Sequence, residues 1–113
     1  ERHGIHAGDL ETSVMLALHP DLVRMDRARD FRSQNARLAE EDTLLGLTPA
    51  GRLAWQMQDI NAAGAAGDAT LATAEKGRCV IDHSARQIVT LLQEIHRLPL
   101  SFLETTADPD AFA

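Results

Sequence analysis

The clearest hydrophobic pattern of this sequence lies in its last third. Five apolar residues recur there at steps of four, three, four and three positions: Ile81, Ala85, Ile88, Leu92 and Ile95. This spacing places them on one face of an α-helix. Thr73 is suited to cap the start of that helix, and Pro99 to end it. We therefore predict one long C-terminal helix whose apolar stripe is buried against a sheet or another helix.

A second, shorter helix is predicted near the N-terminus. The residues from Val14 to Leu18 are almost all large and apolar, and Pro20 stops the run. We expect a loop over residues 1–8 and a helix over about residues 9–19.

The start of this helix has its own signals. Asp9 is the predicted N-cap, since a carboxylate there accepts hydrogen bonds from free backbone N–H groups. Gly8 is predicted to make a tight turn just before it. His6 would then lie on the incoming loop and not on the surface of the helix.

The middle of the chain has weaker patterns. Residues 22–26 alternate between apolar and polar, which favours a strand or an extended segment. Residues 53–58 alternate more clearly and are the best strand candidate. Residues 27–52 are polar and irregular, with a short helix possible within 33–40, and residues 61–67 form a loop of small residues with two glycines.

Composition limits the classes of function. The net charge is −6 and no basic stripe is present, so we expect no nucleic-acid partner. No apolar run is long enough for a membrane span, and we expect a cytoplasmic protein without membrane contact. Only 4% of the residues are aromatic, which is thin for a dense independent core. The single cysteine, Cys79, excludes an internal disulfide and is expected to pack as a small apolar residue.

His6 and Glu11 are the candidate reactive residues. Glu11 falls in the first turn of the predicted helix, where the helix dipole favours its ionised form. A carboxylate beside a neutral imidazole suits divalent-metal binding or general-base catalysis. The simpler alternative is that Glu11 only complements the dipole. The nearby His3 is interpreted as an exposed loop residue.

Two blocks of the sequence resemble the creatininase family of amidohydrolases. The first, from Gly4 to Val23, contains His-Ala-Gly, two variable residues and Glu-Thr-Ser, then an apolar helix, Pro and Leu-Val. The second comprises Ala-Trp-Gln at 54–56, Gly64, Gly-Asp at 67–68, Thr-Leu-Ala-Thr at 70–73 and Glu-Lys-Gly at 75–77. The resemblance covers about residues 4–98, with two motifs in the family's order.

The resemblance implies an α/β fold, the three-layer α-β-α sandwich of that family. This chain would supply its C-terminal part: the motif helix, one or two strands and the long C-terminal helix. We expect residues 1–103 to belong to that domain and residues 104–113 to form a flexible tail.

The resemblance also implies a function, the metal-dependent hydrolysis of non-peptide C–N bonds in small amides. His6 corresponds to the family's catalytic histidine, and Glu11 to its motif glutamate, a metal ligand or a nearby carboxylate. Ile5 and His6 would contact the substrate. The cofactors would be two divalent ions of zinc, manganese or iron. No tryptophan lies beside His6, which makes creatinine itself a doubtful substrate, and Arg2 could pair with an anionic one.

The family's N-terminal metal motifs are absent from these 113 residues. We therefore expect a fragment, in which the isolated chain is inactive and one Glu with one His binds metal weakly. The family forms homo-oligomers, commonly hexamers, and the same is expected of this protein. The alternative function is a catalytically inert fragment that contributes to oligomer assembly.

Overall fold

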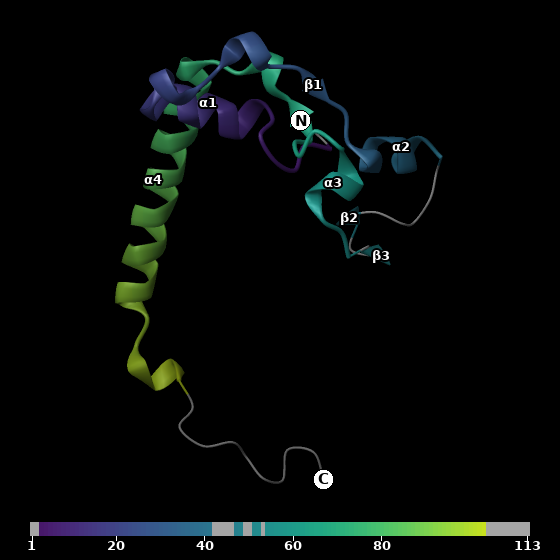
Figure 1. Ribbon diagram of the computed structural model, residues 1–113. Coiled ribbons are helices and arrows are strands. Elements are labelled where there is room, and N and C mark those ends of the chain that lie inside the picture. Colours follow the sequence, from purple (N-terminus) through teal and green to yellow (C-terminus); the bar gives the residue numbers. More distant parts are fainter. Residues whose placement is uncertain (1–2, 42–46, 49–50, 53, 104–113) are drawn as a thin grey trace, which may run out of the picture. The chain divides into compact units, whose positions relative to one another are not determined.

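The structure is a computed structural model that describes residues 3–41, 47–48, 51–52 and 54–103. The chain divides into two compact units, Glu1–Asp82 and His83–Ala113, and the division falls inside the longest helix. The predicted tail over residues 104–113 lies outside the described residues. The helices and strands, in chain order, are α1 (Asp9–Leu18), β1 (Asp30–Phe31), α2 (Gln34–Glu40), β2 (Leu47–Thr48), β3 (Gly51–Arg52), α3 (Met57–Ile60), β4 (Gly67–Asp68) and α4 (Ala74–Arg97) (Figure 1).

Helix α1 confirms the predicted motif helix, but its start differs from the prediction. Gly8 is the N-cap and makes no side-chain cap, while Asp9 is already the first helical residue. The chain turns just before α1 as expected, but the positive φ falls on Ala7, at 56°, whereas Gly8 has an extended backbone. The Asp9 carboxylate does not cap the helix, because it accepts hydrogen bonds from the side chains of Ser13 and Lys76 instead.

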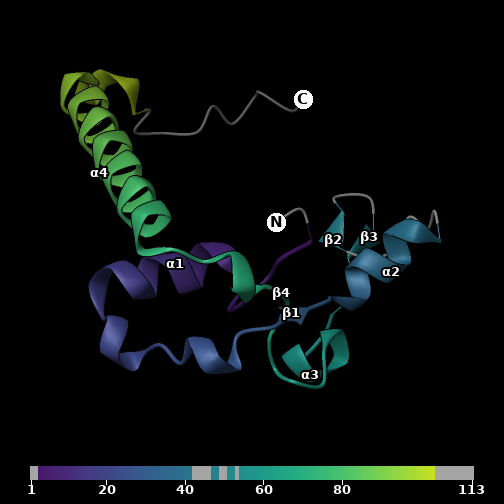
Figure 2. The same ribbon diagram turned by 90° about the horizontal axis from the view of Figure 1, so that it is seen from above.

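The first unit contains a small antiparallel pairing between distant segments. Strand β1 pairs with β4, with Asp30 opposite Asp68 and Phe31 opposite Gly67 (Figure 2). Strands β2 and β3, of two residues each, form a separate antiparallel pair. An isolated bridge joins His6 to Ala66, so the N-terminal segment pairs with the residues just before β4.

Neither predicted strand in the middle of the chain is found among the described residues, and Leu53, the first residue of the second one, lies outside them. Leu22 ends the short 3-10 helix η1 (Pro20–Leu22), and Met25 and Asp26 belong to a second one, η2 (Met25–Arg27). Between them Val23 has an extended backbone, which was the alternative predicted there. Residues 54–56 pair with no described strand, and residues 57–58 begin α3. The alternation there still predicted burial, because Trp55 and Met57 are half-buried while residues 54, 56 and 58 are exposed. The short helix expected within 33–40 is confirmed as α2, capped by Ser33, whose Oγ accepts from the N–H of Ala36 at 3.3 Å.

The start of α4 packs closely on α1 within the first unit. Thr73 caps α4 as predicted, with its Oγ1 accepting from the N–H of Lys76 at 3.2 Å. Gly77 is buried, and a β-carbon added there would come 2.9 Å from the Cβ of Ala17 in α1. Only a residue without a side chain fits this contact.

The buried core consists of small residues. Among the described residues, the buried apolar ones are Ile60 and four alanines, Ala65, Ala66, Ala69 and Ala72, and the alanines lie in and around β4 and the 3-10 helix η3 (Ala69–Leu71). A core of this kind buries little apolar area, which agrees with the low aromatic content.

The second unit contains the C-terminal part of α4 and the 3-10 helix η4 (Leu100–Phe102). The predicted stripe is helical, but its burial is not seen, because Ile88, Leu92 and Ile95 are each more than half exposed. Earlier in the same helix, Cys79 is also exposed, so the expectation that it packs as an apolar residue is wrong. Among the described residues, no helix is both long and apolar enough to cross a membrane.

Candidate functional site

The backbone of His6 is held by the buried residue Ala66. The N–H groups of Ile5 and His6 both donate to the carbonyl oxygen of Ala66, at 2.8 and 3.2 Å. In return, the N–H of Ala66 donates to the carbonyl of His6 at 2.9 Å. Since Ala66 is fully buried, these bonds tie the N-terminal segment to the core. His6 is therefore presented from a fixed backbone, as a loop residue ahead of α1.

The turn between His6 and α1 depends on a strained residue. Ala7 adopts a φ of 56°, in the left-handed region that residues with a side chain rarely occupy. Such conformations cost about 1–3 kcal/mol and persist only where the surroundings enforce them. Here Thr12 Oγ1 donates to the Ala7 carbonyl at 3.3 Å. The turn brings the His6 side chain back toward the first turn of α1.

Glu11 lies in the first turn of α1, just after this turn, and its side chain contacts both His6 and Ala7. Its Oε2 accepts the backbone N–H of Ala7 and lies 3.1 Å from Nδ1 of His6. The side chains of His6 and Glu11 are 58% and 54% exposed, so both remain accessible to solvent. The structure thus brings together the imidazole and the carboxylate that the sequence identified as candidates.

A second polar cluster lies on the other side of the same helix turn. Lys76 Nζ donates to Asp9 Oδ2 at 2.7 Å, and the Ser13 hydroxyl donates to Asp9 Oδ1 at 3.1 Å. The hydrogen bond from Lys76 is the main cause that lowers the pKa of Asp9 below its usual value of 3.8; partial burial opposes the shift, and the bond from Ser13 adds to it. These contacts hold Asp9 as a structural carboxylate between α1 and α4.

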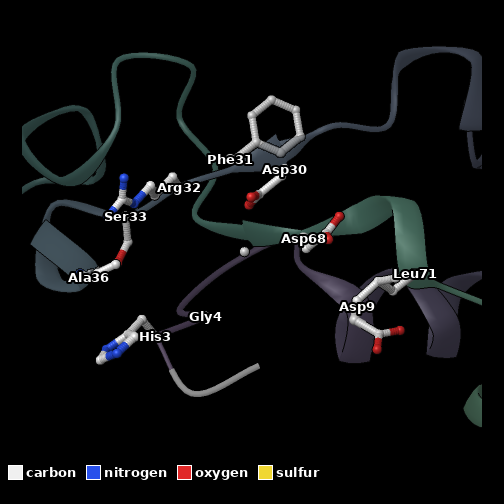
Figure 3. Close-up of a pocket in the computed structure, with 11 residues that line it drawn as sticks. His3, Gly4, Asp9, Asp30, Phe31, Arg32, Ser33, Ala36, Asp68 and Leu71 are labelled. Carbon is white, nitrogen blue, oxygen red and sulfur yellow. Dashed lines mark hydrogen bonds between the residues drawn. The ribbon is translucent and has the colours of Figure 1, made fainter.

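Sequence reasoning missed a cavity of about 270 Å³ at the β1–β4 pairing. Its polar lining includes His3, Asp30, Arg32 and Asp68, and Phe31 adds an aromatic ring (Figure 3). His3 is half-buried, which corrects its interpretation as an exposed loop residue. The Gly-Asp pair at 67–68 belongs to the second family block, whereas Asp30, Phe31 and Arg32 lie in a segment predicted to be irregular.

The two divalent ions implied by the resemblance do not fit the described residues alone. His6 and Glu11 form a pair, and no cluster of three or more His, Cys, Asp or Glu side chains able to hold a metal occurs in the part of the chain that the structure describes. A metal centre normally takes at least three protein ligands. Most ligands would have to come from elsewhere, and the assignment of Glu11 as a ligand stays a prediction.

The sequence and the fold of this chain were each compared with known proteins. The family model described as Creatininase, creatinine amidohydrolase, matches residues 1–92. No match was found among the curated proteins compared. A solved structure from Bacteroides fragilis NCTC 9343, named "Putative creatinine amidohydrolase", is similar over 87% of this chain, with 28% identity and a TM-score of 0.63. The chain spans only 37% of that protein. This likeness confirms the expected α/β creatininase-like fold, of which the chain forms a part. Because the family model matches most of the sequence, this chain belongs to the creatininase family.

Proposed function

We propose that this chain provides the catalytic histidine segment of an amidohydrolase that cleaves C–N bonds in small non-peptide amides. Family membership supports hydrolysis of this general type. The observation that favours a role for this segment is the 3.1 Å contact between His6, on an anchored loop, and Glu11, in the first turn of α1. A solvent-accessible imidazole beside a carboxylate is suited to transfer protons.

In this proposal the His6 imidazole accepts a proton from the attacking water and transfers it to the amide nitrogen as the C–N bond breaks. General acid–base catalysis of this kind needs the imidazole within hydrogen-bond distance of the reacting nitrogen. The His6–Ala66 bridge and the Ala7 turn fix where the imidazole lies. Ile5, half-buried next to it, would contact an apolar part of the substrate. No Phe, Trp or Tyr precedes His6 among the described residues 3–5, so we favour a small amide without a flat ring.

The family is generally metal-dependent. We propose that zinc, manganese or iron is held mainly by ligands outside the described residues, with the chemistry of this chain limited to His6 and its neighbours. The isolated chain should accordingly bind metal weakly and hydrolyse no amide.

The test uses the natural protein that contains this sequence, loaded with zinc, manganese or iron. Release of ammonia or amine is measured against a panel of small amides. His6→Ala should lower kcat by about 100- to 10,000-fold while metal content is unchanged. His83→Ala is the matched control, because His83 is an exposed histidine on α4. Full turnover in His6→Ala, or loss of its metal, would contradict the proposed role, and no release from any amide would contradict the proposed activity.

A second candidate function is self-association through α4, supported by its exposed apolar stripe. Ala85, Ile88, Leu92 and Ile95 follow the four–three spacing of a coiled-coil seam, and all are exposed. The stripe has no charged residue, so a second copy would meet no like charge along it. We propose a second copy of this chain as the partner of this face, within a homo-oligomer that could be a hexamer.

Sedimentation equilibrium tests this assembly. Leu92→Glu should shift the protein toward monomer, because it places a charge in the middle of the stripe. Gln93→Glu adds the same charge at the neighbouring exposed position and should leave association unchanged. A wild-type protein that stays monomeric at high concentration would overturn the proposal, whether the stripe is free or is covered by another part of the natural protein.

A further inference from the structure

We propose that Glu11 is a positioning residue that holds His6 in the tautomer with its proton on Nδ1. The chemical use of this arrangement rests on the proposed function, but the geometry stands on contacts within this chain. The resemblance suggested Glu11 as a metal ligand or a nearby carboxylate. The contacts favour a specific role, in which Glu11 orients the imidazole and leaves Nε2 for the substrate.

The distance between the two side chains requires a proton between them. Glu11 Oε2 and His6 Nδ1 are 3.1 Å apart, which is hydrogen-bond distance. An ionised carboxylate can only accept hydrogen bonds. A neutral imidazole in this contact must therefore hold its proton on Nδ1, and its Nε2 then has a free lone pair.

Glu11 is itself held in place, which distinguishes it from a mobile surface carboxylate. The same oxygen that faces His6 also accepts the N–H of Ala7. Glu11 lies in the first turn of α1, where the helix dipole favours a negative charge. The contact is thus fixed from the side of the carboxylate.

The imidazole is fixed from the other side by its backbone. His6 is joined to the buried Ala66 by hydrogen bonds in both directions, and the strained Ala7 turns the chain so that His6 and Glu11 meet. Exposed ion pairs contribute little to stability. The strain at Ala7 is therefore better explained by the orientation of His6 than by the energy of the contact.

Nitrogen-15 NMR of the histidine side chains tests this inference on the 113-residue chain as it is. At about pH 9, where imidazoles are neutral, the spectrum shows which ring nitrogen bears the proton. We expect Nδ1 to be protonated in His6, unlike the exposed His83 in the same spectrum. In Glu11→Gln the amide can donate as well as accept, so the ratio of the two His6 tautomers should shift toward that of His83, by about three- to tenfold.

Glu75→Gln is the matched control. Glu75 is also an exposed carboxylate in the first turn of a helix, α4, but it has no described ion pair with an imidazole. This variant should leave the His6 tautomer unchanged. A wild-type His6 with its proton mainly on Nε2 would overturn the inference without the need for any variant. That result would leave the proposed hydrolysis untouched, because the measurement involves neither substrate nor metal.

Discussion

Gly77 lies so close to Ser13 that a β-carbon on Gly77 would come 2.0 Å from the Ser13 carbonyl oxygen. Ser13 is fully buried, and its hydroxyl accepts the N–H of Thr73 at 3.0 Å while donating to Asp9. The start of α4 is therefore joined to the N-terminal half of α1 by close backbone approach and by hydrogen bonds. Since Glu11 belongs to α1, this contact also supports the position of the candidate site.

Gly77→Ala should strongly destabilise the first unit. The added methyl group would overlap backbone atoms of Ser13, which cannot move aside as a flexible side chain could. Overpacking of this kind costs about 1–3 kcal/mol or more, measured as the free energy of unfolding in urea. Gly64→Ala is the control for the loss of glycine itself: Gly64 has a φ of +75° but open space around it, so only strain of about 1–2 kcal/mol is expected. Equal losses in both variants would contradict the close contact.

The ion pair between Lys76 and Asp9 should make stability depend on acid pH. The folded-state pKa of Asp9 is lowered below 3.8, so the pair stabilises the fold above that pH and is lost as the pH falls through the lowered value. Lys76→Met should lose up to about 1 kcal/mol of unfolding free energy near neutral pH. In acid the difference in unfolding free energy between wild type and Lys76→Met should become smaller. The difference that remains would come from the hydrogen bond that Lys76 Nζ donates to the Leu71 carbonyl.

Arg78→Met is the control for that pH series, because it removes an exposed cation two residues away. Its effect on unfolding should be small and nearly independent of pH. If the gap between Lys76→Met and wild type stayed constant down to strongly acid pH, the cause assigned to the Asp9 shift would be wrong.

Ala7→Gly should stabilise the fold, although replacing alanine by glycine destabilises a protein at most positions. Relief of the positive φ gains about 1–2 kcal/mol, and the greater freedom of glycine in the unfolded chain offsets about 0.5–1 kcal/mol. Ala39→Gly, at an exposed position of helix α2, should instead destabilise by about 1 kcal/mol. Thermal unfolding of both variants tests whether the change in stability is positive for Ala7→Gly and negative for Ala39→Gly. A loss of stability in Ala7→Gly would argue against strain at this turn.

Titration calorimetry with zinc or manganese tests whether the isolated chain holds enough ligands to bind a metal ion. His6 and Glu11 supply two donors at most, so we predict weak binding without defined stoichiometry. In the natural protein, Glu11→Gln should leave metal occupancy unchanged if Glu11 only positions His6. It should abolish occupancy if Glu11 is a ligand, and weaken binding by about 10- to 100-fold if Glu11 supports a ligand. Tight stoichiometric binding by the isolated chain would show a complete metal site within these residues.

Three of the described helices, α1, α2 and α4, and the proximity of His6 and Glu11 were predictable from the sequence, whereas α3 was not. Helix α1, α2 and α4 depend on spacing and capping within a few turns, and Thr73 and Ser33 are local caps. His6 and Glu11 are five residues apart, so a single turn decides whether they meet. The family motif lies in the same short segment, and for this reason the resemblance was visible without a structure.

Only the tertiary structure decided which segments pair. Residues 22–26 and 54–58 alternate like strands, yet alternation gives a strand only where a partner supplies hydrogen bonds, and the described partners are β1 with β4 and β2 with β3. No local pattern places Asp30 opposite Asp68, or Lys76 beside Asp9. Likewise, the stripe on α4 predicted a helix but not its neighbour, since hydrophobic burial is non-directional and depends on which surface is near. Spacing along the chain determines local conformation, whereas pairing over tens of residues is set by the packing of the whole fold.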